Sequence, residues 1–150
     1  MPKISKKASN AVSQIFTVII FVLLVAALFL LPYVLGLLIE VFDKPPEFFV
    51  PTLIILYVLL VPAFAADVFL FMLLGNIRKN LIFTQKSVLY LRIISWCCIA
   101  AGAVLFALGF YYFMVFLISF AAVFIGVILR VVKNVIEEAT EIKSENDFTI

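Results

Sequence analysis

The side chain best placed to do chemistry in this sequence is Asp67, the one acidic residue inside an otherwise uncharged apolar run, residues 48–74. A carboxylate at the middle of a membrane helix costs roughly 2.5–3.5 kcal/mol to insert, so it is usually paired or functional. We expect an ion pair with Arg92, since a rise of about 1.5 Å per residue places both at a similar depth in neighbouring spans. A polar contact to Ser95 or Tyr90, and an ion or proton site, are the alternatives.

Other side chains suited to catalysis are scarce. The chain has no histidine, which is the commonest general base and metal ligand. Cys97 and Cys98 are neighbours in an apolar run, and helical neighbours point about 100° apart, so neither a disulfide nor a metal site is indicated. Ser95 and Ser119 lack a basic partner that could activate them. We therefore predict that the protein is not an enzyme and has no catalytic, cofactor-binding or metal-binding residues.

The composition indicates the elements that carry these residues. The 150 residues are 67% hydrophobic and 13% charged, whereas soluble domains are about half apolar and a quarter charged. A bilayer core of about 30 Å is crossed by roughly 20 apolar helical residues. We predict a single membrane domain over residues 1–150, an all-α bundle with spans at about 15–39, 48–74, 88–108 and 110–132 and a tail at 133–150. The net charge of +2 is too small to indicate direct nucleic-acid binding.

The last two spans share one uncharged run, residues 93–129. A single helix of that length would be roughly 55 Å long, nearly twice the hydrocarbon thickness, so the run must fold back on itself. We place the break at residues 108–112, where Gly109 permits a turn. Gly102 and Gly126 offer small surfaces for close contact between these spans or between two copies in a homo-oligomer. No internal repeat is predicted.

The lysines and arginines indicate the orientation. They gather in the N-terminal segment, in the loop at residues 75–87 and after the fourth span, whereas the other two loops hold only Lys44. Because cytoplasmic loops of membrane proteins are rich in Lys and Arg, both termini are predicted to be cytoplasmic in a multi-pass protein of the cell membrane. Arg78 and Lys79 then lie on the cytoplasmic surface, and Thr84 or Ser87 could cap the third span.

The tail continues the fourth span as an amphipathic helix. Its apolar stripe is Val132, Val135, Ile136, Ala139 and Ile142, and its polar side carries Lys133, Glu137, Glu141 and Ser144. A helix that rests on the anionic inner leaflet is normally rich in Lys and Arg, whereas this one is acidic. The pattern favours a protein surface as the binding partner of the tail. The alternative is a solvated tail without a partner.

Two segments resemble a known family. FTQKSVLYLR, residues 83–92, and IKSENDFTI, residues 142–150, are similar to segments of the YoaS-like family of short bacterial four-span membrane proteins of unknown function. The matching positions are Phe83, Thr84, Leu91, Arg92, Glu145, Asn146, Asp147, Thr149 and Ile150. The sequence departs from the family at Ser87, where the family favours Asn, and at Phe148, where it favours Leu. The resemblance implies a gene neighbourhood, since such proteins are typically encoded beside a small Cro/C1-type helix-turn-helix regulator.

These observations predict a membrane-embedded regulatory or scaffold protein that binds and tethers a cytoplasmic partner, with the helix-turn-helix regulator as the partner that the resemblance implies. The predicted partner-binding residues are Glu137, Glu138, Glu141, Glu145, Asn146, Asp147, Phe148 and Ile150. One alternative is a small transporter or channel subunit that uses Asp67, although the spans offer little other polar lining. Another is an immunity protein against a membrane-active peptide, acting through the outer loop at residues 40–47.

Overall fold

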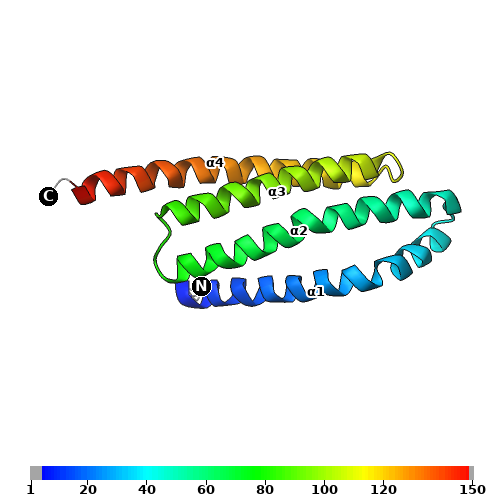
Figure 1. The fold of residues 1–150 in the computed structure, drawn as a ribbon, viewed down its shortest axis with the longest axis horizontal. Helices are drawn as coiled ribbons and strands as arrows, with labels where there is room; N and C mark the ends of the chain where they lie inside the picture. Colours follow the sequence, from blue (N-terminus) through cyan, green and yellow to red (C-terminus); the bar gives the residue numbers. More distant parts are fainter. Residues whose placement is uncertain (1–4, 149–150) are drawn as a thin grey trace.

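The computed structural model of the chain describes residues 5–148, and nearly all of them are helical. Its elements are α1 (Lys6–Val41), a short 3₁₀ turn η1 (Pro46–Phe48), α2 (Phe49–Arg78), α3 (Gln85–Gly109) and α4 (Val115–Phe148) (Figure 1). Each of the four long helices is long and apolar enough to cross a membrane. The predicted all-α fold with four membrane helices is therefore confirmed.

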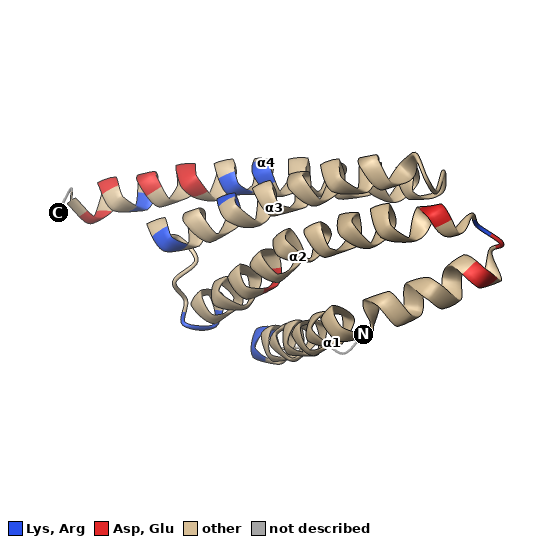
Figure 2. Ribbon diagram, turned by 45° about the vertical axis from the view of Figure 1, so that its right-hand side comes forward, with Lys and Arg blue, Asp and Glu red and all other residues tan. Residues whose placement is uncertain are grey.

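The helices run antiparallel and lie side by side in chain order, so the closest helix pairs are consecutive ones (Figure 1). The start of α1, the α2–α3 loop and the end of α4 lie at one end of the molecule, which we call the basic end. Nearly all lysines and arginines are found there, and the acidic residues of α4 project from it (Figure 2). The opposite end carries the α1–α2 loop and the α3–α4 turn.

The first two helices end in the same way, with one residue in the left-handed conformation. Asn80 after α2 has φ 58°, and the N–H of Leu81 bonds back to the carbonyl of Asn76 at 2.8 Å. Asp43 plays the same part after α1, with φ 47°. Asn and Asp tolerate this conformation better than most residues, and the closing bonds satisfy carbonyls that a helix end leaves free. These two residues explain where α1 and α2 stop.

A reciprocal pair of serine–glycine contacts holds α3 against α4. The Ser95 hydroxyl donates to the Gly126 carbonyl at 2.8 Å, and the Ser119 hydroxyl donates to the Gly102 carbonyl at 2.7 Å. A Cβ on Gly126 would lie 2.7 Å from Cγ1 of Ile99, so the helices approach where side chains are missing. Small residues and cross-helix hydroxyl bonds are the usual means by which membrane helices associate.

The contacts follow from a short pattern that α3 and α4 share. SWCCIAAG, residues 95–102, and SFAAVFIG, residues 119–126, share the pattern serine, aromatic, two small residues, a β-branched residue, two apolar residues and glycine. Because α3 and α4 are antiparallel, the serine of each copy meets the glycine of the other. Gly102 and Gly126 make the close contact between these two helices, which is one of the two roles expected for them.

The hairpin between α3 and α4 differs in detail from the prediction. The helix continues through Gly109, and the turn occupies residues 110–114 rather than 108–112. Gly109 does not have a positive φ. The ring of Phe116 lies where its Cβ would be, with Cδ1 at 2.5 Å. Gly109 therefore allows close packing between the helices, and the backbone reverses only after it.

Candidate functional site

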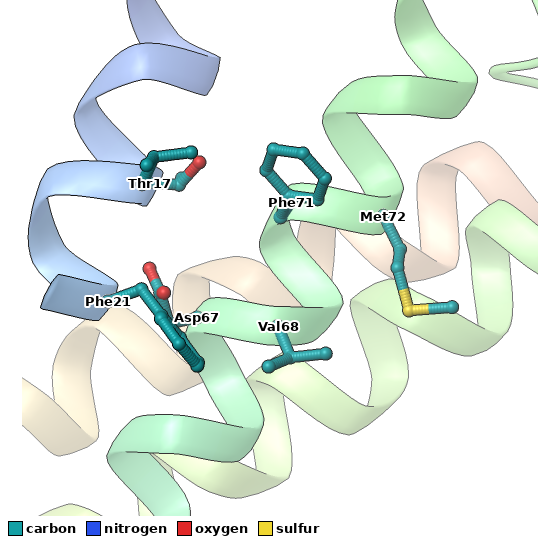
Figure 3. A pocket seen from close by; sticks show the side chains of 7 residues that line it. Thr17, Phe21, Asp67, Val68, Phe71 and Met72 are labelled. Atoms are coloured by element: carbon teal, nitrogen blue, oxygen red, sulfur yellow. The ribbon is translucent and has the colours of Figure 1, made fainter. Parts of the chain in front are cut away.

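The predicted ion pair between Asp67 and Arg92 does not form. Among the described residues, Arg92 pairs with Glu137, their closest nitrogen and oxygen 3.5 Å apart. The reason is the rotation of α2: Ala65 lines a groove together with Arg92, and Asp67, two residues further on, points about 200° away around the helix. Asp67 instead faces α1 (Figure 3). A similar depth of Asp67 and Arg92 along their helices is not enough for a pair, because depth does not decide which helix a side chain faces.

Asp67 is buried beside a cavity of about 240 Å³ between α1 and α2, and only 6% of the residue is exposed. Besides Asp67, the cavity is lined by Thr17 and by apolar side chains that include Phe21 and Phe71 (Figure 3). The Thr17 hydroxyl donates to its own helix, to the Gln14 carbonyl at 2.7 Å. Within residues 5–148 the carboxylate has no hydrogen bond or ion pair with Ser95, Tyr90 or another side chain.

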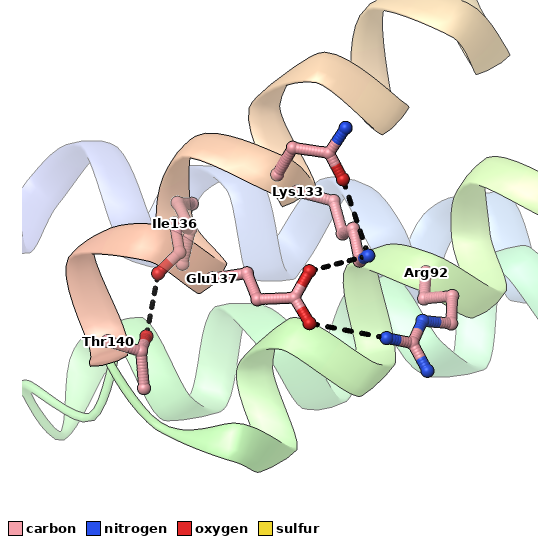
Figure 4. Close-up of polar contacts among 6 residues, drawn as sticks. Arg92, Lys133, Ile136, Glu137 and Thr140 are labelled. Carbon is pink, nitrogen blue, oxygen red and sulfur yellow. Dashed lines mark hydrogen bonds and ion pairs between the residues drawn. The ribbon is translucent and has the colours of Figure 1, made fainter. Parts of the chain in front are cut away.

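The predicted extension of the fourth span into a tail helix agrees with the course of α4, which runs without a break to Phe148. Its segment at residues 133–140 is packed against the rest of the molecule. Ile136 contacts the core formed by Leu73, Leu91 and Ile94. Thr140 is 5% exposed, and its hydroxyl donates to the Ile136 carbonyl at 2.7 Å (Figure 4). The first part of the tail is thus a structural element.

Glu137 pairs with two cations, one on its own helix and one on α3. Its carboxylate is 2.7 Å from the Lys133 ammonium, one helical turn earlier, and also contacts the Arg92 guanidinium of α3 (Figure 4). The hydrogen bond from Lys133 lowers the pKa of Glu137, partial burial opposes this, and the charges of Lys133 and Arg92 lower it further. Lys133 is a site residue that the prediction missed, although its spacing of four residues from Glu137 is a known signal for such pairs.

The apolar stripe predicted for the tail is only partly covered. Ile136 and Ala139 are partly buried, whereas Val132, Val135 and Ile142 are 39%, 61% and 53% exposed. The packed side of this segment is centred between Ile136 and Thr140 because the first turns of α3 lie there. The exposed side therefore combines apolar residues with acidic ones.

The loop before α3 is held by a small set of polar contacts. Thr84, one of the two residues expected to cap α3, does so by accepting the Ser87 N–H at 3.3 Å. Ser87 is 0% exposed; its hydroxyl donates to the Leu81 carbonyl at 2.7 Å and accepts from the Asn76 amide at 3.3 Å. Arg78 donates to the Gln14 side chain of α1 at 3.2 Å. The loop is thus a fixed support for Phe83.

The two segments that carry the family resemblance meet in space. Phe83 of the loop and Ala139, Ile142, Asn146 and Asp147 of α4 line a groove of about 530 Å³ at the basic end. Arg92 of the first segment also holds Glu137 in α4. Ile150, predicted as a partner-binding residue, and Thr149 lie outside the described residues.

Beyond the packed segment, α4 continues as a helix past the α2–α3 loop (Figure 1). All described residues from Glu141 to Phe148 are exposed, and Phe148 is 87% exposed. Glu138 and Glu141 are also exposed and lie about one turn apart on the same side. We call residues 141–148 the projecting end. This end presents acidic residues (Figure 2) and one large aromatic ring to its surroundings.

Comparisons with known proteins agree with the resemblance. The model of a family described as "Protein of unknown function (DUF2975)" matches residues 40–150, which include α2, α3 and α4. The chain is 32% identical over 160 aligned positions to the uncharacterized membrane protein YoaS of Bacillus subtilis, covering 94% of this chain and 99% of that protein. No solved structure matches the chain.

Proposed function

Because the chain belongs to the DUF2975 family of proteins of unknown function, we propose its role from the site alone: it is a membrane-embedded scaffold or regulatory protein that binds a cytoplasmic partner through the end of α4. That it is a membrane protein follows from its relative and its four candidate spans. The proposal places the basic end in the cytoplasm, and it assigns no catalytic step to the chain.

The observation that carries the proposal is the continuity of α4. A surface helix without contacts would fray, but residues 133–140 are held by the packing of Ile136 against the core and by the ion pair of Glu137 with Arg92 of α3. The projecting end is therefore presented in one orientation relative to the membrane helices. A preorganised surface binds at a lower entropic cost than a flexible tail.

The chemistry of the exposed side supports a basic partner. Glu138 and Glu141 supply negative charge, and Ile142 and Phe148 supply apolar area beside it. Such a surface is complementary to a basic protein with an apolar recess, and charge complementarity speeds association and excludes acidic partners. A small helix-turn-helix regulator, the partner implied by the family resemblance, presents a basic DNA-binding face of this kind. Binding would hold it at the membrane.

The proposal is tested by purification from native membranes with the full chain and with a chain truncated after Thr140. This truncation leaves Ile136, Glu137 and the packed segment in place and removes the projecting end. We expect a basic protein to co-purify with the full chain only, and to bind it again after both are purified. Recovery of the same proteins with both chains would contradict the proposal.

Asp67 supports a second candidate function, a small transporter subunit. The supporting observation is the buried carboxylate beside a cavity, without a hydrogen bond or ion pair in the described part of the chain. The apolar lining provides few further polar groups for a permeating ion. The test is a proton flux into reconstituted vesicles, driven by an imposed potential. Loss of this flux in Asp67→Asn, with thermal unfolding unchanged, would favour this function. Absence of flux in the wild type would rule out proton transport.

A further inference from the structure

A second groove lies on the outside of the molecule, between α2 and α3, and no part of the proposed function uses it. It has a volume of about 620 Å³. Val58, Pro62 and Ala65 form the α2 side, and Trp96 and Val104 lie on the α3 side. Within the described chain, the one charged residue on its walls is Arg92, and the others are apolar or weakly polar. We call it the Arg92 groove.

The length of the Arg92 groove matches one leaflet of a bilayer. Arg92 and Val104, the first and last α3 residues that line it, are twelve residues apart, which corresponds to about 18 Å along a helix. Half of a hydrocarbon core is about 15 Å thick. The groove therefore begins at the basic end and reaches the middle of the membrane. An acyl chain of one leaflet spans the same depth.

Cations gather where the groove reaches the basic end. The Arg92 side chain is 48% exposed, so its guanidinium is open to a further ligand. The Arg130 guanidinium of α4 lies 4.6 Å from the ring centroid of Trp96, a groove residue. Tryptophan and arginine are typical of the membrane–water interface, where lipid phosphates lie. One end of the groove is thus suited to an anion and the rest to a hydrocarbon chain.

We infer that the Arg92 groove binds an anionic phospholipid, with the phosphate at Arg92 and Arg130 and one acyl chain along Pro62, Trp96 and Val104. Basic pockets between membrane helices are a recognised way to bind anionic headgroups. The pair between Arg92 and Glu137 is long, at 3.5 Å, whereas Glu137 keeps Lys133 at 2.7 Å. A lipid phosphate can therefore share or take Arg92 without leaving Glu137 unpaired.

The single tryptophan of the chain makes this site directly measurable, because bromine atoms on a lipid quench tryptophan fluorescence on contact. The protein is reconstituted in two kinds of phosphatidylcholine vesicle. In one, a minor share of the lipid is brominated phosphatidylglycerol; in the other, the same share is brominated phosphatidylcholine. In both, the bromine atoms lie near the top of the acyl chain. For the wild type we expect phosphatidylglycerol to be favoured at Trp96 by about fivefold or more, as two nearby arginines imply.

Two variants test which cations are responsible, and the ratio between the two lipids is compared within each variant. Arg92→Gln combined with Arg130→Gln should bring the ratio close to one. Lys79→Gln removes an exposed cation of the basic end that does not line the groove, and should keep the wild-type ratio. Circular dichroism checks that each variant is folded.

Three results would overturn the inference. The first is equal quenching of the wild type by both brominated lipids. The second is a preference for phosphatidylglycerol that survives loss of both arginines. The third is weak quenching by either lipid together with a dimer in cross-linking, which would show that a second copy of the chain covers the groove.

Discussion

The two helical hairpins of this molecule are built differently. Between α3 and α4, hydroxyls of Ser95 and Ser119 donate to buried carbonyls on the facing helix, and glycines allow the backbones to touch. Between α1 and α2, two exposed hydrogen bonds cross from helix to helix: Tyr57 donates to the Leu28 carbonyl and Arg78 donates to the Gln14 side chain. The interface there also contains Asp67 and its cavity.

The α3–α4 hairpin is thus a rigid support, whereas the α1–α2 hairpin is packed more loosely. The α3–α4 hairpin carries the projecting end, and the ion pair between Arg92 and Glu137 continues its interface toward the point where α4 leaves the molecule. A rigid hairpin fixes the direction of this end. The α1–α2 pair has space and a buried acid, which are features that tolerate rearrangement. We therefore expect substitutions to affect the two hairpins very differently.

The largest effect should come from filling a close helix contact. Gly102→Ala places a Cβ against Val123 Cγ2, so α3 and α4 must separate or repack, at a cost of about 1–3 kcal/mol. Gly36→Ala in α1 is the matched control, because no atom lies within 4 Å of its added Cβ. Unfolding in a denaturing detergent, followed by circular dichroism, measures both. Equal stability of the two variants would remove the distinction between the hairpins.

Removing the cross-helix hydroxyls should have the next largest effect. Membrane hydrogen bonds of this type contribute about 0.6 kcal/mol each, so Ser95→Ala with Ser119→Ala should cost about 1 kcal/mol. Ser13→Ala is the comparison, since that hydroxyl donates within α1 to the Ser9 carbonyl and is exposed. The same unfolding measurement applies. A cost for Ser13→Ala as large as that of the double variant would contradict the account.

Asp67→Asn tests the looser hairpin. Because the carboxylate has no ion pair among the described residues, replacing it with a neutral side chain of the same shape should leave stability unchanged or raise it by up to about 1 kcal/mol. Thermal unfolding of wild type and variant gives the comparison. A clear loss of stability would mean that Asp67 has a stabilising partner in the membrane.

The smallest effect should be the pH dependence of the packed tail. The folded pKa of Glu137 lies below its ordinary value, chiefly through the hydrogen bond from Lys133. Its contribution is therefore present above the unfolded pKa of about 4.5 and is lost as pH falls through the lower folded value. The protection of the amides of residues 133–140 against hydrogen exchange, taken relative to their intrinsic rate at each pH, should fall below that pH. In Glu137→Gln this pH-dependent change should be absent. A change as large as that of the wild type would show that another group causes it.

Much of the fold could be predicted because membrane insertion depends on composition and length. Uncharged runs longer than a bilayer is thick, with lysines between them, indicate four helices directly. The partner of Arg92 could not be found in this way. One residue along a helix rotates the side chain by about 100°, and packing sets that rotation, so Arg92 meets Glu137 while Asp67 faces α1.

The sequence predicted where the candidate site lies, in the tail after the fourth span, but not which of its residues are packed and which are exposed. The acidic pattern after Arg130 indicated a helix outside the membrane, and Phe83 and Asp147 were both singled out before the structure placed them in one groove. The alternation of exposed and packed residues differed from the predicted stripe. That difference arises because the first turns of α3 cover one side of residues 133–140, a contact that the tail sequence alone does not encode.

The central claim is that the acidic end of α4 binds a basic cytoplasmic partner, and reversal of its charge tests this most directly. Glu138→Lys with Glu141→Lys changes two exposed acids of α4, and Glu40→Lys with Glu47→Lys makes the same change at the opposite end of the molecule. Each variant is used to purify bound protein from native membranes. The account predicts that the α4 variant loses the partner and the control keeps it. Retention by the α4 variant, or loss only in the control, would contradict it.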